Sequence, residues 1–177
     1  MPATMTIQEH NGATPTLTDK TSGQIRYRKT DSATVDLNNP LVVPTTATEY
    51  SFPKYLRMRI TAGTYTEVSN PRVYTDGASG YGLNIKLWFK ATGTYVTPAI
   101  PSTAQDPPQI AGGAMTDAFT YTSGAPLDLD LINTGNIASG GEPKDVWDYL
   151  VSVLEVEVGA TQGVKSAESV TFLWDEV

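Results

Sequence analysis

Residues 54–60 read KYLRMRI and residues 83–90 read LNIKLWFK. In the first stretch the apolar residues are Leu56, Met58 and Ile60, and Arg57 and Arg59 separate them. In the second stretch the alternating apolar residues are Leu83, Ile85, Leu87 and Phe89. A repeat of two places successive side chains on opposite faces of a β-strand. Both stretches therefore predict strands with one face in a core, and they place Trp88 in the outward register.

The rest of the chain repeats this pattern in shorter pieces. Pairs such as Asn70-Pro71 and Asp76-Gly77 separate the apolar runs and predict turns. Many short strands joined by such turns are typical of an antiparallel sandwich. We therefore predict an all-β fold, a two-sheet β-sandwich of the jelly-roll or immunoglobulin-like kind. The further candidate strands are residues 25–27, 35–37, 41–43, 64–69, 72–75, 95–97, 119–121, 127–132, 149–158 and 169–174.

One stretch has a helical alternative. Residues 142–158 read EPKDVWDYLVSVLEVEV, and a helix starting at Asp145 would fit the spacing. The stretch contains five valines, however, and residues 154–158 alternate between apolar and acidic side chains. Because β-branched residues favour strands over helices, we predict a strand over residues 149–158.

Two segments lack the alternation. Residues 1–23 are rich in Thr and poor in large apolar side chains, which predicts an extended N-terminal arm before a single sandwich domain at 24–177. A frayed tail is the alternative. Residues 98–117, the Pro-rich segment, hold four prolines and predict a long loop. Long loops are usually functional or disordered, and proline lowers the entropy lost on ordering, so we expect this segment to project and dock on a partner.

The charge of the chain limits its partners. Among 177 residues, 12 basic and 19 acidic side chains give a net charge of −7. The first 90 residues carry 10 basic and 7 acidic side chains (net +3), and the remainder carries 2 and 12 (net −10). An acidic protein is repelled by phosphate backbones, so we expect no direct nucleic-acid binding. This uneven distribution has two interpretations. Either the basic and acidic side chains mix on the surface of one folded molecule, or a basic edge of one copy meets an acidic edge of a neighbouring copy.

Other classes of function are excluded by what the chain lacks. There is no Cys, which excludes disulfides, thiolate metal sites and a cysteine nucleophile. The longest strongly apolar stretch, residues 149–154, is far shorter than the roughly 20 residues that span a bilayer. Residues 1–12 lack the basic and apolar regions of a secretory signal. We therefore expect no membrane partner and synthesis in a cytoplasm.

The candidate catalytic motifs are weak. His10 is the single histidine, and it lies in the predicted arm without apolar neighbours to orient it as a base. Residues 76–82, DGASGYG, lack the spacing of a nucleophile elbow or a phosphate loop and predict a hairpin connection. No nucleophile, base and orienting group can be assembled from these residues, so we expect no enzyme.

Two pairs of carboxylates follow strand spacing. Asp128 with Asp130, and Glu155 with Glu157, alternate with apolar residues, so each pair shares one face of its strand. Two carboxylates on one face suit a Ca²⁺ site or an acid–base pair. Strand periodicity alone produces the same pattern, and we therefore expect solvated faces.

Aromatic and basic side chains offer surfaces for binding. Trp88, outward on its strand, suits either a sugar platform or an interface anchor, although packing within the fold is the simpler interpretation. Arg57 and Arg59, beside Tyr55, suit nucleic acid with base stacking. The negative net charge argues against nucleic acid, and outward arginines pair equally well with acidic groups of a neighbouring copy.

The order of these motifs resembles one family. The succession IRYRKTDSATVDLNNPLVVP (25–44), SFPKYLRMRI (51–60), EVSNPRVYTDG (67–77), LNIKLWFKATGTYVTP (83–98) and SVTFLWDEV (169–177) is similar to a group of tailed-bacteriophage virion structural proteins. The similarity spans residues 25–177, and its motifs mark a fold rather than an active site. Pro71 stands where the family pattern has an aliphatic residue. The resemblance implies a β-rich particle component on the head shell or at the neck or tail.

The expected function is a non-enzymatic structural role in the virion, as a capsid decoration or minor head protein that stabilises the shell through multivalent contacts. A neck or tail protein that contacts a portal, tube or fibre is the first alternative, and a carbohydrate-binding sandwich is the second. We expect no catalytic residue, metal or cofactor, a homo-oligomer, and the major capsid protein or other virion proteins as partners. The residues expected at partner contacts are Trp88, Arg57, Arg59, Pro101, Pro107, Pro108 and Ile110.

Overall fold

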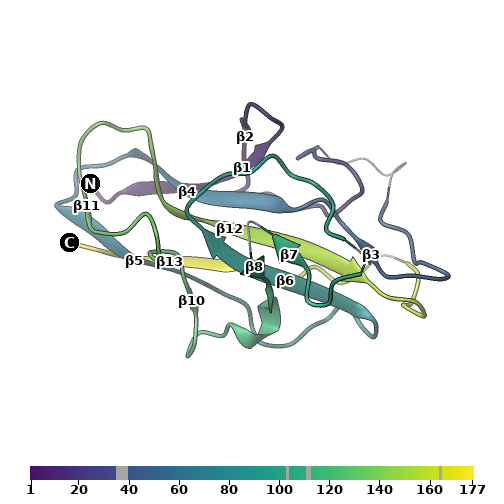
Figure 1. Cartoon of the computed structure of the whole chain (residues 1–177). Coiled ribbons are helices and arrows are strands. Elements are labelled where there is room, and N and C mark those ends of the chain that lie inside the picture. Colours follow the sequence, from purple (N-terminus) through teal and green to yellow (C-terminus); the bar gives the residue numbers. More distant parts are fainter. Residues whose placement is uncertain (35–39, 103, 111–112, 164) are drawn as a thin grey trace.

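A computed structural model describes residues 1–34, 40–102, 104–110, 113–163 and 165–177 (Figure 1). The described chain consists of strands and one short 3-10 helix, which confirms the predicted all-β class. The elements are β1 (Thr4–Asn11), β2 (Thr16–Asp19), β3 (Glu49–Tyr50), β4 (Lys54–Ala62), β5 (Glu67–Tyr74), β6 (Ile85–Thr92), β7 (Gln109–Ile110), β8 (Gly113–Ala114), β9 (Thr116–Asp117), η1 (Ala118–Thr120), β10 (Leu127–Asp128), β11 (Ile137–Ala138), β12 (Lys144–Val156) and β13 (Thr171–Glu176).

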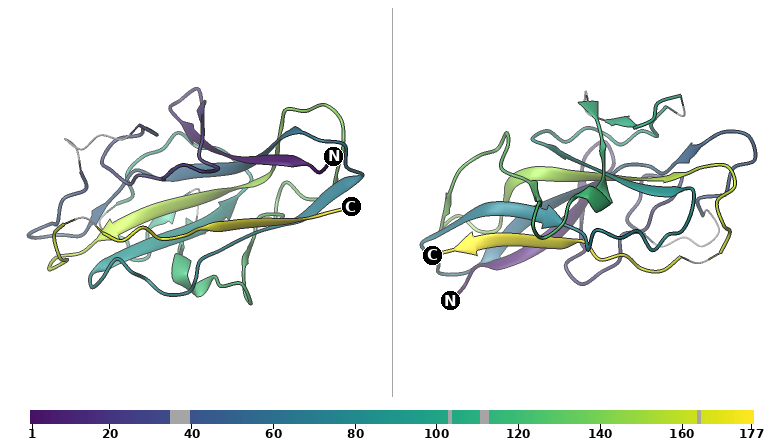
Figure 2. Two further views of the ribbon diagram at one scale, coloured as in Figure 1. Left: turned by 180° about the vertical axis from the view of Figure 1, so that it is seen from behind. Right: turned by 90° about the horizontal axis from the view of Figure 1, so that it is seen from below.

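Two antiparallel sheets pack together, as the turn spacing predicted. The larger sheet has seven strands in the order β2-β1-β4-β12-β6-β9, with β3 also paired to β12. The smaller sheet has four strands around β5, which pairs with β10, β11 and β13. Strands β7 and β8 form a separate two-stranded ribbon. Viewed from below, β5 and β13 lie on one side of β6 and β12, and the β7–β8 ribbon lies on the other (Figure 2).

The inner face of the larger sheet forms the main core. Across the sheet, Leu150 lies opposite Leu56, and Leu154 lies opposite Leu87. These side chains pack against the smaller sheet. The main cluster consists of Leu56, Val73, Leu87, Phe89, Ala118, Leu127, Leu129 and Leu150, all buried. The alternation in 54–60 and 83–90 therefore identified this face correctly.

The outer face of the larger sheet is also covered. Here Val151 lies opposite Tyr55, and Val153 lies opposite Trp88. The Pro-rich segment supplies the cover, because Ile110 and Met115 are buried against these side chains. The cluster consists of Tyr50, Tyr55, Trp88, Ile110, Met115, Tyr149, Val151 and Val153. The described part of the segment is thus attached to its own sheet through Ile110 and Met115, and the expectation of a freely projecting loop is wrong.

The N-terminal residues are part of the larger sheet and not an extended arm. Residues 4–10 pair with β4, and β2 pairs back onto β1. Met5 is buried in the inner core, and Glu9 forms a buried ion pair with Lys54 at 2.8 Å. Residues 4–11 can form this strand with few large apolar side chains, because Thr favours strands. The buried charges of Glu9 and Lys54 also neutralise each other. The arm prediction is therefore wrong.

The predicted turn at Asn70-Pro71 is also wrong, because both residues lie inside β5. Asn70 has a φ of 51°, and the register with β13 shifts between Leu173 and Asp175. Two residues of β5 thus lie opposite one residue of β13, which is the arrangement of a β-bulge. The missing N–H of Pro71 is tolerated at such a position.

The remaining strand predictions have mixed outcomes. The strand predicted over residues 149–158 is confirmed as far as Val156, where β12 ends, and 169–174 largely coincides with β13. Residues 25–27, 41–43 and 95–97 are not strands, residues 118–120 form η1, and the strand predicted over 127–132 ends at Asp128. The prediction for residues 35–37 lies outside the described residues. A short apolar run therefore does not predict a strand reliably, because its side chains can pack on a sheet while its backbone pairs with no strand.

Candidate functional site

Several of the predicted contact residues meet beneath the Pro-rich segment. Pro101, Pro108 and Ile110 are buried, and Pro107 is half-buried. Trp88 points to the outer face as predicted, but only 8% of it is exposed because the segment lies over it. Of these residues, Trp88 and Ile110 pack in one apolar cluster. The expectation that Trp88 is an exposed anchor is therefore wrong, and the ring cannot serve as an open sugar platform in this conformation.

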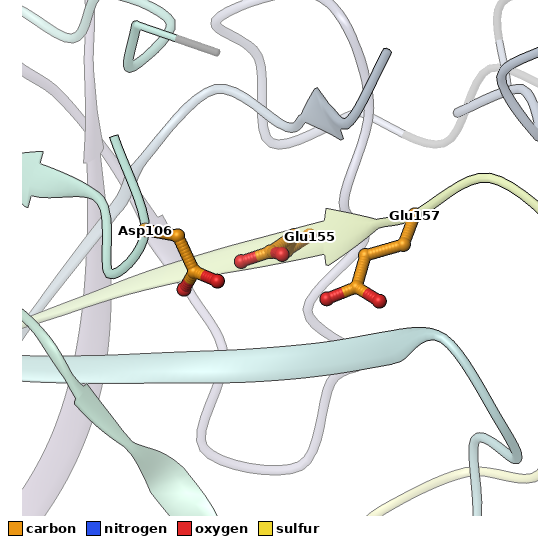
Figure 3. Close-up of side chains that lie close together, drawn as sticks. All are labelled: Asp106, Glu155 and Glu157. Carbon is orange, nitrogen blue, oxygen red and sulfur yellow. The ribbon is translucent and has the colours of Figure 1, made fainter. Parts of the chain in front are cut away.

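An acidic cluster lies beside Trp88, between the segment and the end of β12. Oxygen atoms of Asp106, Glu155 and Glu157 lie within 4.8 Å of one another (Figure 3). Asp106 belongs to the segment, and the two glutamates come from the end of β12 and the residue just beyond it. Glu155 is only 1% exposed and accepts a hydrogen bond of 2.6 Å from the indole Nε1 of Trp88. The expected solvated face is therefore wrong for Glu155.

Lys86 supplies the positive charge of this cluster. It lies opposite Glu155 across β6 and β12. Its Nζ is 2.5 Å from Glu157, 3.7 Å from Asp106 and 3.8 Å from Glu155. A hard cation such as Ca²⁺ uses oxygen ligands of this kind. Here the Lys86 ammonium occupies the space among the carboxylates, so the arrangement is an ion-pair cluster in the described conformation.

The two glutamates have opposite pKa shifts. Burial raises the pKa of Glu155 to about 7. The hydrogen bond from Lys86 lowers the pKa of Glu157. Carboxyl groups whose pKa values are pushed apart are the pattern of an acid–base pair. A substrate would also need an open cleft, and a hollow of about 250 Å³ at the segment is lined by other residues, among them Tyr55, Val96 and Ile100.

The two predicted arginine contacts are used within the chain. Arg59 forms an ion pair of 2.5 Å with Asp145 on β12. The guanidinium of Arg57 lies 4.7 Å from the ring centre of Tyr149, and its Nε donates to the carbonyl of Trp147 at 2.9 Å. Together with Lys86 and Arg72, which pairs with Asp175, these contacts join the basic first half to the acidic second half. Other ion pairs, such as Glu9 with Lys20 and Lys54, lie within the first half, so pairing inside the chain accounts for only part of the split charge.

His10 lies in an aromatic environment that the sequence did not indicate. It is buried on the outer face, and its ring meets Tyr149 edge-on at 5.0 Å. Tyr95 lies 6.0 Å away. Burial lowers the pKa of His10. The histidine is therefore neutral at neutral pH, and its Nδ1 lies 3.4 Å from the hydroxyl of Tyr149.

A second region presents apolar side chains to solvent. Leu131 is 58% exposed and Ile132 is 65% exposed. The buried carboxylate of Asp148 accepts backbone N–H bonds from Leu131, Ile132 and Asn133 at 3.1, 3.0 and 2.8 Å. Three charge-assisted hydrogen bonds fix the backbone of this turn. The exposed side chains are thus held in place, and we call residues 131–133 the apolar turn.

The aspartates predicted on a sheet face instead shape the loop around this turn. Asp128 accepts the N–H of Asp130 at 2.9 Å, and Asp130 accepts the N–H of Gly135 at 2.8 Å. Gly93 is required opposite the turn, because a Cβ there would lie 2.5 Å from a methyl group of Ile132. Alternation in LDLDLI predicted a strand, but the aspartates cap local backbone N–H groups, a common use of Asp in turns.

Asp148 reaches the apolar turn because β12 is irregular at this point. The register between β12 and β4 shifts between Val146 and Leu150, and Trp147 has a φ of 56°. A bulge of this kind re-aims side chains. Nothing in the local sequence marks it, since Trp and Asp are ordinary residues in a regular strand as well.

Comparisons with protein-family models, with curated proteins and with solved structures found no match. The described residues include no helix with the length and hydrophobicity of a membrane span.

Proposed function

We propose that this protein is a non-enzymatic structural component of a bacteriophage particle, and specifically a capsid decoration or minor head protein. Its sequence resembles tailed-phage virion proteins over residues 25–177. The carboxylates of the acidic cluster are paired with Lys86 and do not line the hollow at the segment, which favours a structural role over catalysis. The partners are the major capsid protein or other virion proteins, together with further copies of this chain.

The apolar turn is the observation that carries this proposal. Exposed apolar side chains that stand alone are normal, whereas contiguous ones mark interaction sites. In this protein the buried carboxylate of Asp148 accepts hydrogen bonds from the backbone of Leu131 and Ile132, and the side chains of both residues remain exposed to solvent. A rigid apolar surface loses little conformational entropy on binding. When many copies bind one shell, weak individual contacts together give strong binding.

The test is binding to empty shells assembled from the major capsid protein. The double variant Leu131→Ser with Ile132→Ser should bind at least about tenfold more weakly, because the interface would lose the burial of two large apolar side chains. Leu83→Ser is the matched control, since Leu83 is also highly exposed but lies in the connection before β6. Equal binding by the double variant and the control would contradict the proposal.

A neck or tail location is the structural alternative, and copy number distinguishes the two. Imaging of the intact particle should show about hundreds of copies over the head for a decoration protein, because every capsomer offers a site. A single ring of about a dozen copies or fewer would favour the neck or tail. The carbohydrate-binding alternative depended on an exposed Trp88, which is buried here.

A further inference from the structure

The Pro-rich segment is fastened to the larger sheet at two kinds of contact. Ile110 and Met115 supply the apolar contact by packing with Trp88 and Val153. The polar contacts lie at its edge, where the hydroxyl of Tyr50 donates to the carbonyl of Gln105 at 2.5 Å and Lys90 donates to the carbonyl of Ile110 at 2.7 Å. The segment thus lies over the cluster of charges at the end of β12.

The charges at this contact do not balance when all carboxyl groups are ionised. Glu155 faces Lys86 and Trp88 from β6 and Tyr50 from β3. Two further carboxylates lie beside it, Asp106 from the segment and Glu157 just beyond the end of β12. Among the described residues, three carboxylates then lie within 3.8 Å of the Lys86 ammonium group, while Lys90, further along β6, donates to the carbonyl of Ile110. The excess negative charge lies partly on the sheet and partly on the segment, so it repels the segment from the sheet.

Protonation of the cluster removes this repulsion. We propose that a shared proton in the Asp106–Glu155–Glu157 cluster latches the Pro-rich segment onto the sheet, so that the segment is held at mildly acidic pH and loosened at mildly alkaline pH. The proton resides on Glu155, the most deeply buried of the three groups, because burial disfavours its charged form. Lys86 remains paired with Glu157 in both states.

The direction of the effect follows from proton linkage. With the segment docked, the pKa of Glu155 is raised to about 7 from its ordinary value of 4.5. Between these two pH values the docked form binds more protons than the open form. Docking is therefore strongest near the lower value and weakens as the pH rises to the upper one. Each unit of pKa difference changes the docking equilibrium by about tenfold.

The absence of Cys allows a direct test by thiol protection. A single Met115→Cys substitution places a thiol on the buried side of the segment, and Ser102→Cys places one at an exposed position of the segment. The ratio of their reaction rates with a disulfide reagent gives the protection of the buried thiol at each pH, corrected for thiolate formation. We expect this protection to fall at least about tenfold between about pH 5 and about pH 8.

Substitutions in the acidic cluster test whether protonation of Glu155 causes the pH response. Glu155→Gln in the Met115→Cys background mimics the protonated state, so protection should stay high and constant within about twofold. Glu168→Gln is the matched control, because Glu168 instead accepts the N–H of Gly80 outside the cluster, and it should keep the full pH response. A full response in Glu155→Gln, or no response in the parent, would overturn the proposal.

A second substitution covers the case in which Glu155→Gln fails to fold, which circular dichroism would reveal. Asp106→Asn removes one charge from the exposed, segment side of the cluster, where the side chain tolerates change. Its pH response should be clearly smaller than that of the parent, since less repulsion opposes docking. An unchanged response in Asp106→Asn would then refute the latch.

Discussion

The two faces of the larger sheet are both covered, but by different means. The inner face packs Leu56, Leu87 and Leu150 against a second sheet. The outer face packs Tyr55, Trp88 and Val153 under an irregular segment, with charged groups at the edge. The inner face is stabilised mainly by apolar burial, which is nearly independent of pH, although it also contains the buried Glu9–Lys54 ion pair. On the outer face the buried ionisable groups lie under an irregular segment, and we therefore expect this face to respond to pH and to open locally.

The largest expected effect concerns the strand that contributes to both faces. Removal of residues 1–23 deletes β1, its pairing with β4 and the buried side chains of Met5 and His10. The loss should exceed about 5 kcal/mol, the low end of the stability of a domain, so the truncated chain should not fold. Circular dichroism and thermal unfolding measure this. Leu17→Ser on β2 is a control that should fold, and a folded truncation would restore the prediction of a dispensable arm.

The next effect compares one residue from each face. Leu150→Ala, on the inner face, should lower the free energy of unfolding by about 2–5 kcal/mol. Met115→Ala, on the outer face, should cost less in global unfolding, because the segment can open without the rest. Hydrogen exchange of residues 113–117 should instead increase in Met115→Ala. Equal global losses in urea unfolding would show that the two faces form one cooperative unit.

A smaller effect is the pH dependence due to His10 on the outer face. Burial lowers the pKa of His10 below its ordinary value of 6.5, so the unfolded chain takes up the proton more readily. Stability that is present above pH 6.5 is therefore lost as the pH falls toward the lowered pKa. Urea unfolding of the natural chain and His10→Gln at several pH values measures the difference. Parallel pH profiles of the two proteins would contradict this role.

The smallest effect is expected for an ion pair on the smaller sheet. Arg72 and Asp175 pair at 2.6 Å, and their side chains are 36% and 50% exposed. Asp175→Asn should therefore cost less than about 1 kcal/mol. The cost should diminish further at high salt, where exposed charges are screened. A larger loss of stability in thermal unfolding, unchanged by salt, would mean that this ion pair contributes substantially to the stability of the fold.

Part of this arrangement was predictable because it depends on local pattern. The alternation in residues 54–60 and 83–90 predicted β4, β6 and the inner core, and the valines of β12 excluded a helix. The sequence did not reveal the burial of His10, Glu155 and Asp148, because each is buried by a segment distant in the chain. A lone acidic residue has no sequence signal that distinguishes a surface position from a buried one.

The amino-acid sequence alone determined the all-β class, the two sheets and the apolar face of the central strands, because a period of two leaves a strand one way to bury its apolar side chains. Tertiary structure decided what covers the other face. The Pro-rich segment, the N-terminal strand and the bulge in β12 each acquire their place through contacts with residues far away in the chain. Such contacts depend on the folded geometry, and local propensity does not encode them.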